Sequence, residues 1–147
     1  MAKRAIYLAG AMGGLSVADA NSWRQECEIE LKGCYAVLNP ISVQFEKDPK
    51  FIFSSIEPNL TAQQVTVKDR FYIDQSDFIL ANLSDPKAVS IGTIWEMGYA
   101  YGKGKNIVTV CPTGTKFYDG HPFVMCFSHV VFQTLAEAID FLNDIAV

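Results

Sequence analysis

Short apolar runs alternate with longer amphipathic stretches along most of this chain. Five runs have the length and composition of β-strands, namely Ala5–Ala9, Tyr35–Leu38, Phe78–Leu83, Asn106–Cys111 and His129–Phe132. Nearly continuous apolar runs of this length are typical of parallel strands that are buried on both faces.

Helices are predicted between these strands. They begin after Ser16, after Thr61, at Thr93 and at Leu135, and end near Gly33, Gln75, Tyr101 and Ile145. Ser16 is a suitable N-cap, and Thr61 with Gln64 has the spacing of a capping box. The inward faces expected from helical spacing are Ala20, Trp23, Cys27 and Leu31 in the first helix, and Leu135, Ala138, Ile139, Leu142 and Ile145 in the last.

This alternation predicts one α/β domain over residues 1–147. The expected fold is a doubly wound, flavodoxin- or Rossmann-like sheet of about five parallel strands with helices on both faces. Ligands of such folds bind beyond the carboxyl ends of the strands. We expect Gly10–Gly14, Ser84–Glu96 and the turn after Cys111 at that edge. Between Ile41 and Leu60 the pattern fails, and a connection of this length is usually functional.

Composition and charge narrow the class of function. Of the 147 residues, 50% are hydrophobic and 19% are charged, so we expect a full core. A net charge of −4 and a pI near 5.1 argue against binding a nucleic acid polymer, which needs a basic surface. No apolar stretch is long enough to span a bilayer, and the first residues lack a signal-peptide core, so we expect a cytoplasmic protein.

The cysteines and histidines form no recognisable metal or redox motif. Cys27, Cys34, Cys111 and Cys126 include no C-x-x-C pair, and none has metal-ligand spacing with His121 or His129. We therefore expect reduced thiols, histidines that are structural or exposed, and no metal. Asp77, just before the third strand, is interpreted as a turn or cap residue.

Glu96 lies where a loop becomes a helix at the predicted sheet edge, and two interpretations are open. Thr93 and Glu96 have capping-box spacing, so the carboxylate could reach back to its own helix N-terminus, and spacing alone favours this role. Alternatively, Glu96 is a functional carboxylate in the crevice, with Gly92 and Gly98 leaving space around it.

Two other polar residues fall on apolar surfaces. Asp69 shares a helix face with Val65, Tyr72 and Ile73, where a carboxylate is costly to desolvate without a partner. It either has a function there or pairs with Lys68 or Arg70. Tyr7 sits mid-strand as a core tyrosine, and its hydroxyl would need a partner such as a carboxylate across the sheet edge.

The glycine-rich turn Gly10–Gly14 also has two interpretations. Its backbone N–H groups could hold a phosphate where a helix begins. It is neither a G-x-G-x-x-G nor a Walker sequence and lacks the Walker lysine, so a plain strand–helix turn is the other interpretation.

Three segments together carry a resemblance to a known family. They are Ile6–Gly10, Asp69 followed by Ser76–Leu80, and Gly92–Ala100, in an order and approximate spacing that hold from Tyr7 to about Val110. These segments resemble the nucleoside 2-deoxyribosyltransferase family, which includes the 2′-deoxynucleoside 5′-phosphate N-hydrolases.

The resemblance implies a flavodoxin-like sheet, a homodimer or higher homo-oligomer with shared active sites, a small nucleoside or nucleotide substrate and no cofactor. It assigns Glu96 as the nucleophile on C1′, Asp69 to proton transfer near the base and Tyr7 to holding Glu96. This is the logic of a retaining glycosidase. Substrate contacts are implied at Gly10, Met12, Gly13, Gly14, Ser90, Gly92 and Met125.

The residue at position 90 bears on the substrate. Typical transferases carry an aspartate there that binds the sugar hydroxyls, whereas the nucleotide N-hydrolases carry a serine that contacts the 5′-phosphate. Ser90 and the loop Gly10–Gly14 therefore favour a monophosphate. Against this, the chain has Val124 where those hydrolases have a serine from the neighbouring subunit and the transferases an asparagine, although Ser128 is close by. The C-terminus also lacks the aromatic and carboxylate tail of some transferases.

Transfer to a base and transfer to water are both consistent with the sequence. The segment between Ile41 and Leu60 is interpreted as a lid or base-contacting loop. Competing hypotheses are a non-catalytic nucleotide-binding or sensing module on the same fold, and an NAD-glycohydrolase that also uses a glutamate. Ligand binding that survives Glu96→Ala would support the first, and nicotinamide release from NAD the second.

Overall fold

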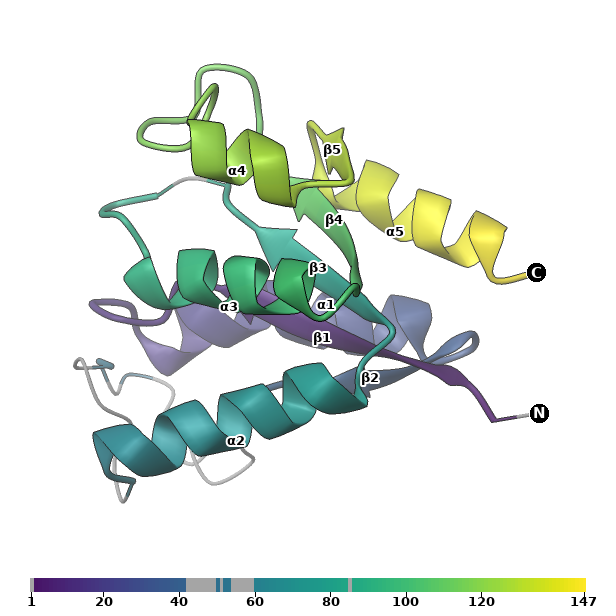
Figure 1. Ribbon diagram of the computed structural model, residues 1–147, viewed down its shortest axis with the longest axis horizontal. Coiled ribbons are helices and arrows are strands. Elements are labelled where there is room, and N and C mark those ends of the chain that lie inside the picture. Colours follow the sequence, from purple (N-terminus) through teal and green to yellow (C-terminus); the bar gives the residue numbers. More distant parts are fainter. Residues whose placement is uncertain (1, 42–49, 51, 54–59, 85) are drawn as a thin grey trace.

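Five parallel strands form one sheet in the order β2-β1-β3-β4-β5, as a computed structural model of the chain shows (Figure 1). The structure describes residues 2–41, 50, 52–53, 60–84 and 86–147. The strands are β1 (Arg4–Gly10), β2 (Tyr35–Leu38), β3 (Phe78–Asn82), β4 (Asn106–Val110) and β5 (Val130–Phe132). This confirms the α/β fold predicted from the sequence.

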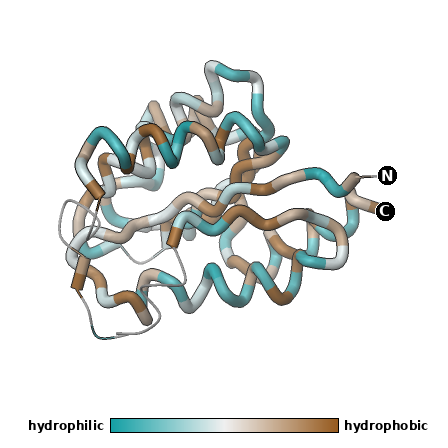
Figure 2. The backbone as a smooth tube through the Cα atoms, turned by 90° about the horizontal axis from the view of Figure 1, so that it is seen from below, coloured by the Kyte–Doolittle hydropathy of each residue, from teal (hydrophilic) through white to brown (hydrophobic). Residues whose placement is uncertain are grey.

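Helices cover both faces of the sheet. They are α1 (Val17–Leu31), α2 (Ala62–Gln75), α3 (Ile91–Gly102), α4 (Pro122–Phe127) and α5 (Leu135–Ile145). In Figure 1, α2, α3 and α4 lie on the near face of the sheet, and α1 and α5 lie on the far face. Figure 2 shows hydrophobic residues concentrated along the central strands and hydrophilic residues recurring along the flanking helices.

Alternation along β1 sends its side chains into two separate cores. Ile6 and Leu8 pack with residues of α1 and α5, whereas Tyr7 and Ala9 pack with residues of α2, α3 and α4. Tyr7 therefore points to the same side of the sheet as α3. This placement decides which groups its hydroxyl can reach.

The strand order reverses direction at β1. From β1 the chain crosses to β2 on one side, and then returns to β3 on the other, so β1 and β3 form the switch point of the sheet. Gly10 and Asn82 are paired at the carboxyl ends of these two strands. Connections leave on opposite faces at such a point and leave a crevice between them.

The predicted helix starts are confirmed for α1 and α2. The Ser16 side chain accepts a hydrogen bond from the Asp19 N–H at 3.1 Å. Thr61 and Gln64 form both bonds of the capping box, at 3.1 and 2.8 Å. The residues predicted inward in α1 are buried, or half-buried in the case of Trp23.

Three local predictions are wrong. Helix α3 begins at Ile91, not Thr93, because Ser90 is its N-cap. The short helix α4 was not predicted, because the run Pro122–Phe127 is too short and too uniformly apolar to display a helical period. Ile145 was predicted inward, yet it is 46% exposed in the last turn of α5, beyond the reach of the sheet.

Candidate active site

A cleft of about 750 Å³ opens at the carboxyl edge of the sheet, and both Gly10 and Asn82 line it. This volume lies within the range of about 300–1,000 Å³ that is typical of small-molecule sites. The predicted segments Gly10–Gly14 and Ser84–Glu96 both contribute lining residues. The turn after Cys111 follows the carboxyl end of β4, but it contributes no lining residue. Instead, the Tyr118 hydroxyl accepts a hydrogen bond from the Ser90 N–H at 2.7 Å and so supports the start of α3.

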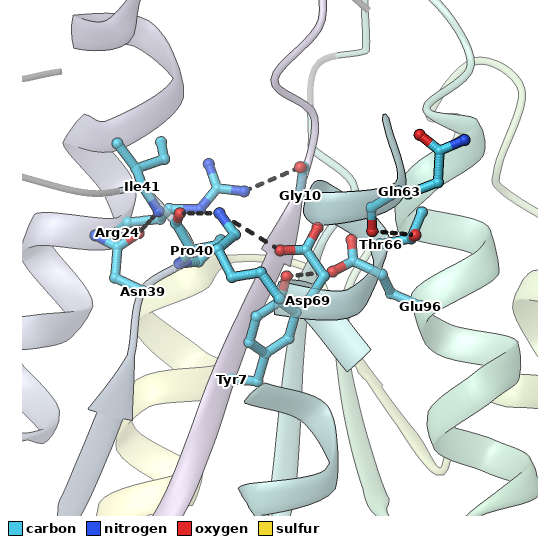
Figure 3. Close-up of polar contacts among 11 residues, drawn as sticks. Tyr7, Gly10, Arg24, Asn39, Pro40, Ile41, Gln63, Thr66, Asp69 and Glu96 are labelled. Atoms are coloured by element: carbon cyan, nitrogen blue, oxygen red, sulfur yellow. Dashed lines mark hydrogen bonds and ion pairs between the residues drawn. The ribbon is translucent and has the colours of Figure 1, made fainter. Parts of the chain in front are cut away.

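Glu96 and Tyr7 form a buried hydrogen-bonded pair at this cleft. The Tyr7 hydroxyl on β1 donates to Oε2 of Glu96 on α3 (Figure 3). Only 8% of Glu96 and 1% of Tyr7 are exposed. The Glu96 carboxylate also lines the cleft, so it is accessible to a small ligand while its other contacts are protein.

The electrostatics of the pair follow from burial. The pKa of Glu96 is raised to about 8: burial is the largest cause and the nearby Asp69 carboxylate adds to it, while the Tyr7 hydrogen bond, Arg24 and Lys68 act in the lowering direction. Burial, followed by the charge of Glu96, raises the pKa of Tyr7 well above its usual value. Tyr7 therefore remains a hydrogen-bond donor at neutral pH.

The capping interpretation of Glu96 is wrong. The Ser90 side chain caps α3 by accepting from the Thr93 N–H at 3.4 Å, and the Ser90 and Thr93 hydroxyls are 2.7 Å apart. Glu96 faces Tyr7 instead of its own helix N-terminus. Its place in α3 is set by the sheet, because Thr93, Glu96, Met97 and Ala100 make up the buried stripe of that helix.

Asp69 of α2 lies beside this pair and lines the same cleft (Figure 3). Its Oδ1 is 3.6 Å from Nζ of Lys68, whose ammonium also donates to the Pro40 carbonyl at 2.9 Å. The pairing with Lys68 is confirmed, and Asp69 also lines the cleft, so its functional role stays a prediction. Its charge is close enough to raise the pKa values of Glu96 and Tyr7.

The loop Gly10–Gly14 lines the cleft, but part of its backbone is already bonded. The Gly14 N–H donates to the Phe53 carbonyl at 2.9 Å, and the Phe53 N–H donates to the Leu15 carbonyl at 2.9 Å. Gly14 has φ +79°, which suits glycine. Met12 and Gly13 also line the cleft, and their N–H groups make no backbone hydrogen bond within the described part of the chain.

Gly10 is a glycine because neighbouring atoms approach its backbone closely. A Cβ at this position would lie 2.6 Å from Cζ2 of Trp23 and 3.4 Å from Nη2 of Arg24. Trp23 itself lines the cleft and its ring lies against Arg24. Neither Trp23 nor Arg24 was predicted as a site residue.

The first turn of α3 forms another part of the cleft. Ser90 and Gly92 line it as predicted, and Lys87 lines it from the preceding loop. A Cβ on Gly92 would meet no atom within 4 Å, so this position leaves open space. A Cβ on Gly98 would lie 3.3 Å from the Phe127 ring of α4. Gly98 therefore allows close packing of α3 on α4, and the prediction that it leaves space beside Glu96 is wrong.

Met125 is not among the residues that line the cleft of its own chain. It lies on α4 and is 40% exposed. Val124 is buried, and the Ser128 hydroxyl bonds to Thr109 and to the Val124 carbonyl, at 2.7 and 2.6 Å. Within one chain, this region therefore does not contribute to the site.

The remaining candidates have structural roles. His121 caps α4, and Nδ1 of His129 accepts from the Ile107 N–H at 3.0 Å. Asp77 joins β1 to β3 by accepting from the Ala5 N–H at 2.9 Å. All four cysteines are free thiols. Within the described ranges, no group of three or more His, Cys, Asp or Glu residues could hold a metal ion, and no helix could cross a membrane.

The segment between Ile41 and Leu60 is described only in part. Phe53 is buried and lines the cleft. The prediction of a lid or base-contacting loop concerns mainly residues 42–49, 51 and 54–59, which lie outside the described residues.

The parallel sheet, the cleft at its switch point and the buried carboxylate define a flavodoxin-like α/β protein with a site for a small ligand. Its sequence matches the family described as Nucleoside 2-deoxyribosyltransferase over residues 6–137, and the chain belongs to that family. Membership supports activity on the N-glycosidic bond of nucleosides, by deoxyribosyl transfer or by hydrolysis. A comparison with curated proteins gave no match.

Solved structures of low sequence identity share the fold. A conserved protein of Enterococcus faecalis V583 has a TM-score of 0.69 and 16% identity, with 98% of this chain and 99% of that chain covered. A 2-deoxyribosyltransferase of Bacillus psychrosaccharolyticus has a TM-score of 0.62 and 21% identity, with 96% and 89% covered. The CMP N-glycosidase BcmB of Clostridium botulinum has a TM-score of 0.60 and 19% identity, with 95% and 98% covered.

Proposed function

We propose that this protein cleaves the N-glycosidic bond of a 2′-deoxynucleoside or its 5′-monophosphate, with Glu96 as the nucleophile. The observation that carries the proposal is the Glu96 carboxylate, buried at the cleft and held by the Tyr7 hydroxyl. A carboxylate that is desolvated and fixed in a cleft is a candidate for covalent catalysis.

In the first step, a carboxylate oxygen of Glu96 forms a bond to C1′ of the sugar. The C1′–N bond breaks at the same time, and its electron pair leaves with the base. A proton from the Asp69 carboxyl group, or from a water that it holds, neutralises the departing base. The products are the free base and a deoxyribosyl ester of Glu96.

In the second step, an acceptor attacks C1′ and returns the Glu96 carboxylate. If the acceptor is another base, its ring nitrogen forms the new bond and loses its proton to Asp69, which gives a new nucleoside. If the acceptor is water, its oxygen bonds to C1′ and one of its protons passes to Asp69, so the sugar is released with a hydroxyl at C1′. Both routes leave the protein unchanged and need no redox chemistry.

Tyr7 has a defined part in this cycle. Its O–H donates to the Glu96 carboxylate, and this stabilises the ionised form that must attack C1′. It also fixes one of the two carboxylate oxygens, so the other is the one available for bonding. We therefore assign Tyr7 to positioning the nucleophile.

A 5′-monophosphate is the substrate that the cleft favours. Ser90 lines it with an uncharged hydroxyl, and the first turn of α3 contributes the positive end of a helix dipole. Lys87 and the N–H groups of Met12 and Gly13 are further donors at the cleft. A phosphate is attracted by this set, whereas an aspartate at position 90 would repel it.

We propose that the active unit is a homo-oligomer. Exposed apolar side chains gather on α3 and α4, and we call Ile91, Trp95, Tyr101, Phe123 and Met125 the α3–α4 apolar surface. They are between 40% and 80% exposed, which is unusual for so many large apolar residues on adjacent helices. A second copy of the chain is the partner that this surface fits, and Met125 would then face the neighbouring site.

Incubation with deoxyadenosine or its monophosphate, with and without cytosine, tests the proposal. Release of adenine from the wild type and none from Glu96→Ala is the expected result. A new deoxynucleoside in the presence of cytosine identifies transfer, and free sugar identifies hydrolysis. Substrate binding by both proteins without base release from either would favour a non-catalytic module.

A further inference from the structure

Arg24 is a buried cation behind the cleft. It lies on α1, it is 0% exposed, and it does not line the cleft. Its guanidinium carbon is 4.6 Å from the ring centroid of Trp23, the cleft residue that precedes it. Figure 3 shows Arg24 on one side of β1, and Asp69 and Glu96 on the other.

The hydrogen bonds of Arg24 fix its position at the end of β1. Strand β2 pairs with β1 only as far as Leu38 opposite Tyr7, so the last carbonyl of β1 has no partner from β2. Nη2 of Arg24 donates to that carbonyl, on Gly10, at 2.9 Å, and Nη1 donates to the Ala20 carbonyl. The charge is therefore held in one place by backbone groups.

No acidic side chain of the described residues lies within 4.0 Å of the Arg24 guanidinium, and its Nε has no hydrogen-bond partner among them. A buried charge without a direct counter-ion is costly. Across β1 are two carboxylates, Glu96 and Asp69, and one nearby cation, Lys68. With Arg24 included, this set has two carboxyl groups and two cations.

We propose that Arg24 is a positioning residue whose fixed positive charge, across β1 from the two cleft carboxyl groups, favours the reactive ionised form of Glu96. The groups that face Glu96 are Tyr7 from β1, Asp69 and Lys68 from α2, and Arg24 from α1. Lys68 is paired with Asp69 at 3.6 Å, and of the two cations Arg24 has the larger lowering effect on the pKa of Glu96.

The electrostatic effects agree with this arrangement. Burial and then Asp69 raise the pKa of Glu96, which is about 8 overall, and Arg24 acts in the lowering direction. In return, burial lowers the pKa of Arg24 to about 10, and the charges of Tyr7, Glu96 and Asp69 act to raise it. The inference rests on the proposed function of Glu96, and it adds a residue on the opposite side of the sheet from the chemistry.

The first test is the pH profile of kcat/KM for Arg24→Met, Arg24→Lys and the wild type. Arg24→Met is expected to move the acidic limb up by about one pH unit, to lower kcat at pH 7 about tenfold, and to change KM less than threefold. Arg24→Lys retains the charge and is expected to restore most of the wild-type profile. Gln25→Met, on the exposed side of α1, is the matched control and should leave the profile unchanged.

The second test does not depend on turnover. In the pH dependence of unfolding, Glu96→Gln should gain stability over its parent at pH 9, and this gain should be larger in the Arg24→Met background than in the wild type. If wild type releases no base, the enzymatic proposal fails while this test still decides the role of Arg24. Where Arg24→Met does not fold, Arg24→Gln replaces it in both tests. Two results together would overturn the inference and make Arg24 a structural residue only. They are a loss of kcat/KM in Arg24→Met that is equal at every pH, and a stability gain from Glu96→Gln that is the same in both backgrounds.

Discussion

The hydrogen bond from Tyr7 to Glu96 leads to a prediction about the pH dependence of kcat/KM. Attack on C1′ needs the carboxylate, so kcat/KM should rise with pH through about 8. Tyr7→Phe removes a donor that lowers the pKa of Glu96, so the rising limb should move to higher pH, with about a tenfold loss at pH 7. Tyr72→Phe, a tyrosine 6.4 Å away between ring centroids, is the control. A Tyr7→Phe profile that overlays the wild type would remove Tyr7 from the mechanism.

Burial of Glu96 makes a separate prediction about stability. Its pKa in the folded protein is about 8, well above the 4.5 of an exposed glutamate, so the folded state binds this proton more tightly than the unfolded state does. The contribution of Glu96 to the free energy of unfolding therefore falls as pH rises from about 4.5. Above about pH 8 the buried carboxyl group is ionised and the full loss of stability is present.

Glu96→Gln should consequently be inactive and yet more stable at high pH. We expect a gain of about 1 kcal/mol or more in unfolding free energy at pH 9, and little difference at pH 4.5. Calorimetry or denaturant unfolding across this range measures it. A variant that is less stable than the wild type at every pH would point to a structural role for Glu96.

Sequence reasoning identified the acidic residues of the site better than the basic residue behind it. Asp69 and Tyr7 were singled out because a carboxylate and a hydroxyl on apolar surfaces are unusual, and Glu96 because it lies at the predicted sheet edge. All three also match positions in the family that the sequence resembles. Arg24 was not found, although its spacing of four from Ala20 and three from Cys27 places it on the predicted inward face of α1, where a charged residue is as unusual as Asp69 is on α2. Only the folded chain reveals that this helix turns Arg24 toward the end of β1.

The start of α3 depends on Ser90, and this gives a test of substrate class. Aspartate caps a helix as well as serine does, so Ser90→Asp should leave the fold intact. Its added charge should raise KM for a deoxynucleoside monophosphate about tenfold or more and change KM for the free nucleoside less than threefold. Ser90→Ala is the control, which loses the cap without adding charge. Equal KM changes for both substrates would place the phosphate elsewhere.

The elements whose ends carry polar caps were the easiest to predict. Thr61 with Gln64, and Ser16 alone, gave the starts of α2 and α1 correctly, because those bonds are local. At α3 the predicted cap was Thr93, whereas the helix is capped by Ser90, three residues earlier. Tertiary contacts decide between them, since Tyr118 holds the Ser90 N–H from a distant loop. A sequence pattern contains no information on that contact.

At the scale of the whole molecule, the main feature is the α3–α4 apolar surface, which is exposed in the single chain. Phe123 is 60% exposed on this surface, and its ring stacks on Phe127 at 5.9 Å between centroids. Phe123→Glu is expected to dissociate the oligomer and to lower activity at least about tenfold if the sites are shared. Phe71→Glu on α2 is the matched control, with 59% exposure on another part of the surface. Sedimentation of both variants measures the outcome, and an unchanged mass for Phe123→Glu would contradict the proposed interface.

The parallel sheet and the edge at which the cleft lies could be predicted well, because alternating short strands and helices allow few topologies. The α3–α4 apolar surface could not be predicted, because apolar residues that are exposed on α4 cannot be told from core residues in the sequence. Met125 illustrates this, since it was predicted to contact substrate and yet lies outside the cleft of its own chain.

Mass spectrometry of enzyme quenched during turnover tests the role of Glu96 most directly. With a deoxynucleoside or its monophosphate in excess, the peptide that contains Glu96 should gain the mass of one deoxyribosyl group, with its phosphate if present. Glu96→Gln should show no such adduct. Base release by the wild type without an adduct on Glu96 would contradict the proposed mechanism. Full activity of Glu96→Gln would contradict it as well.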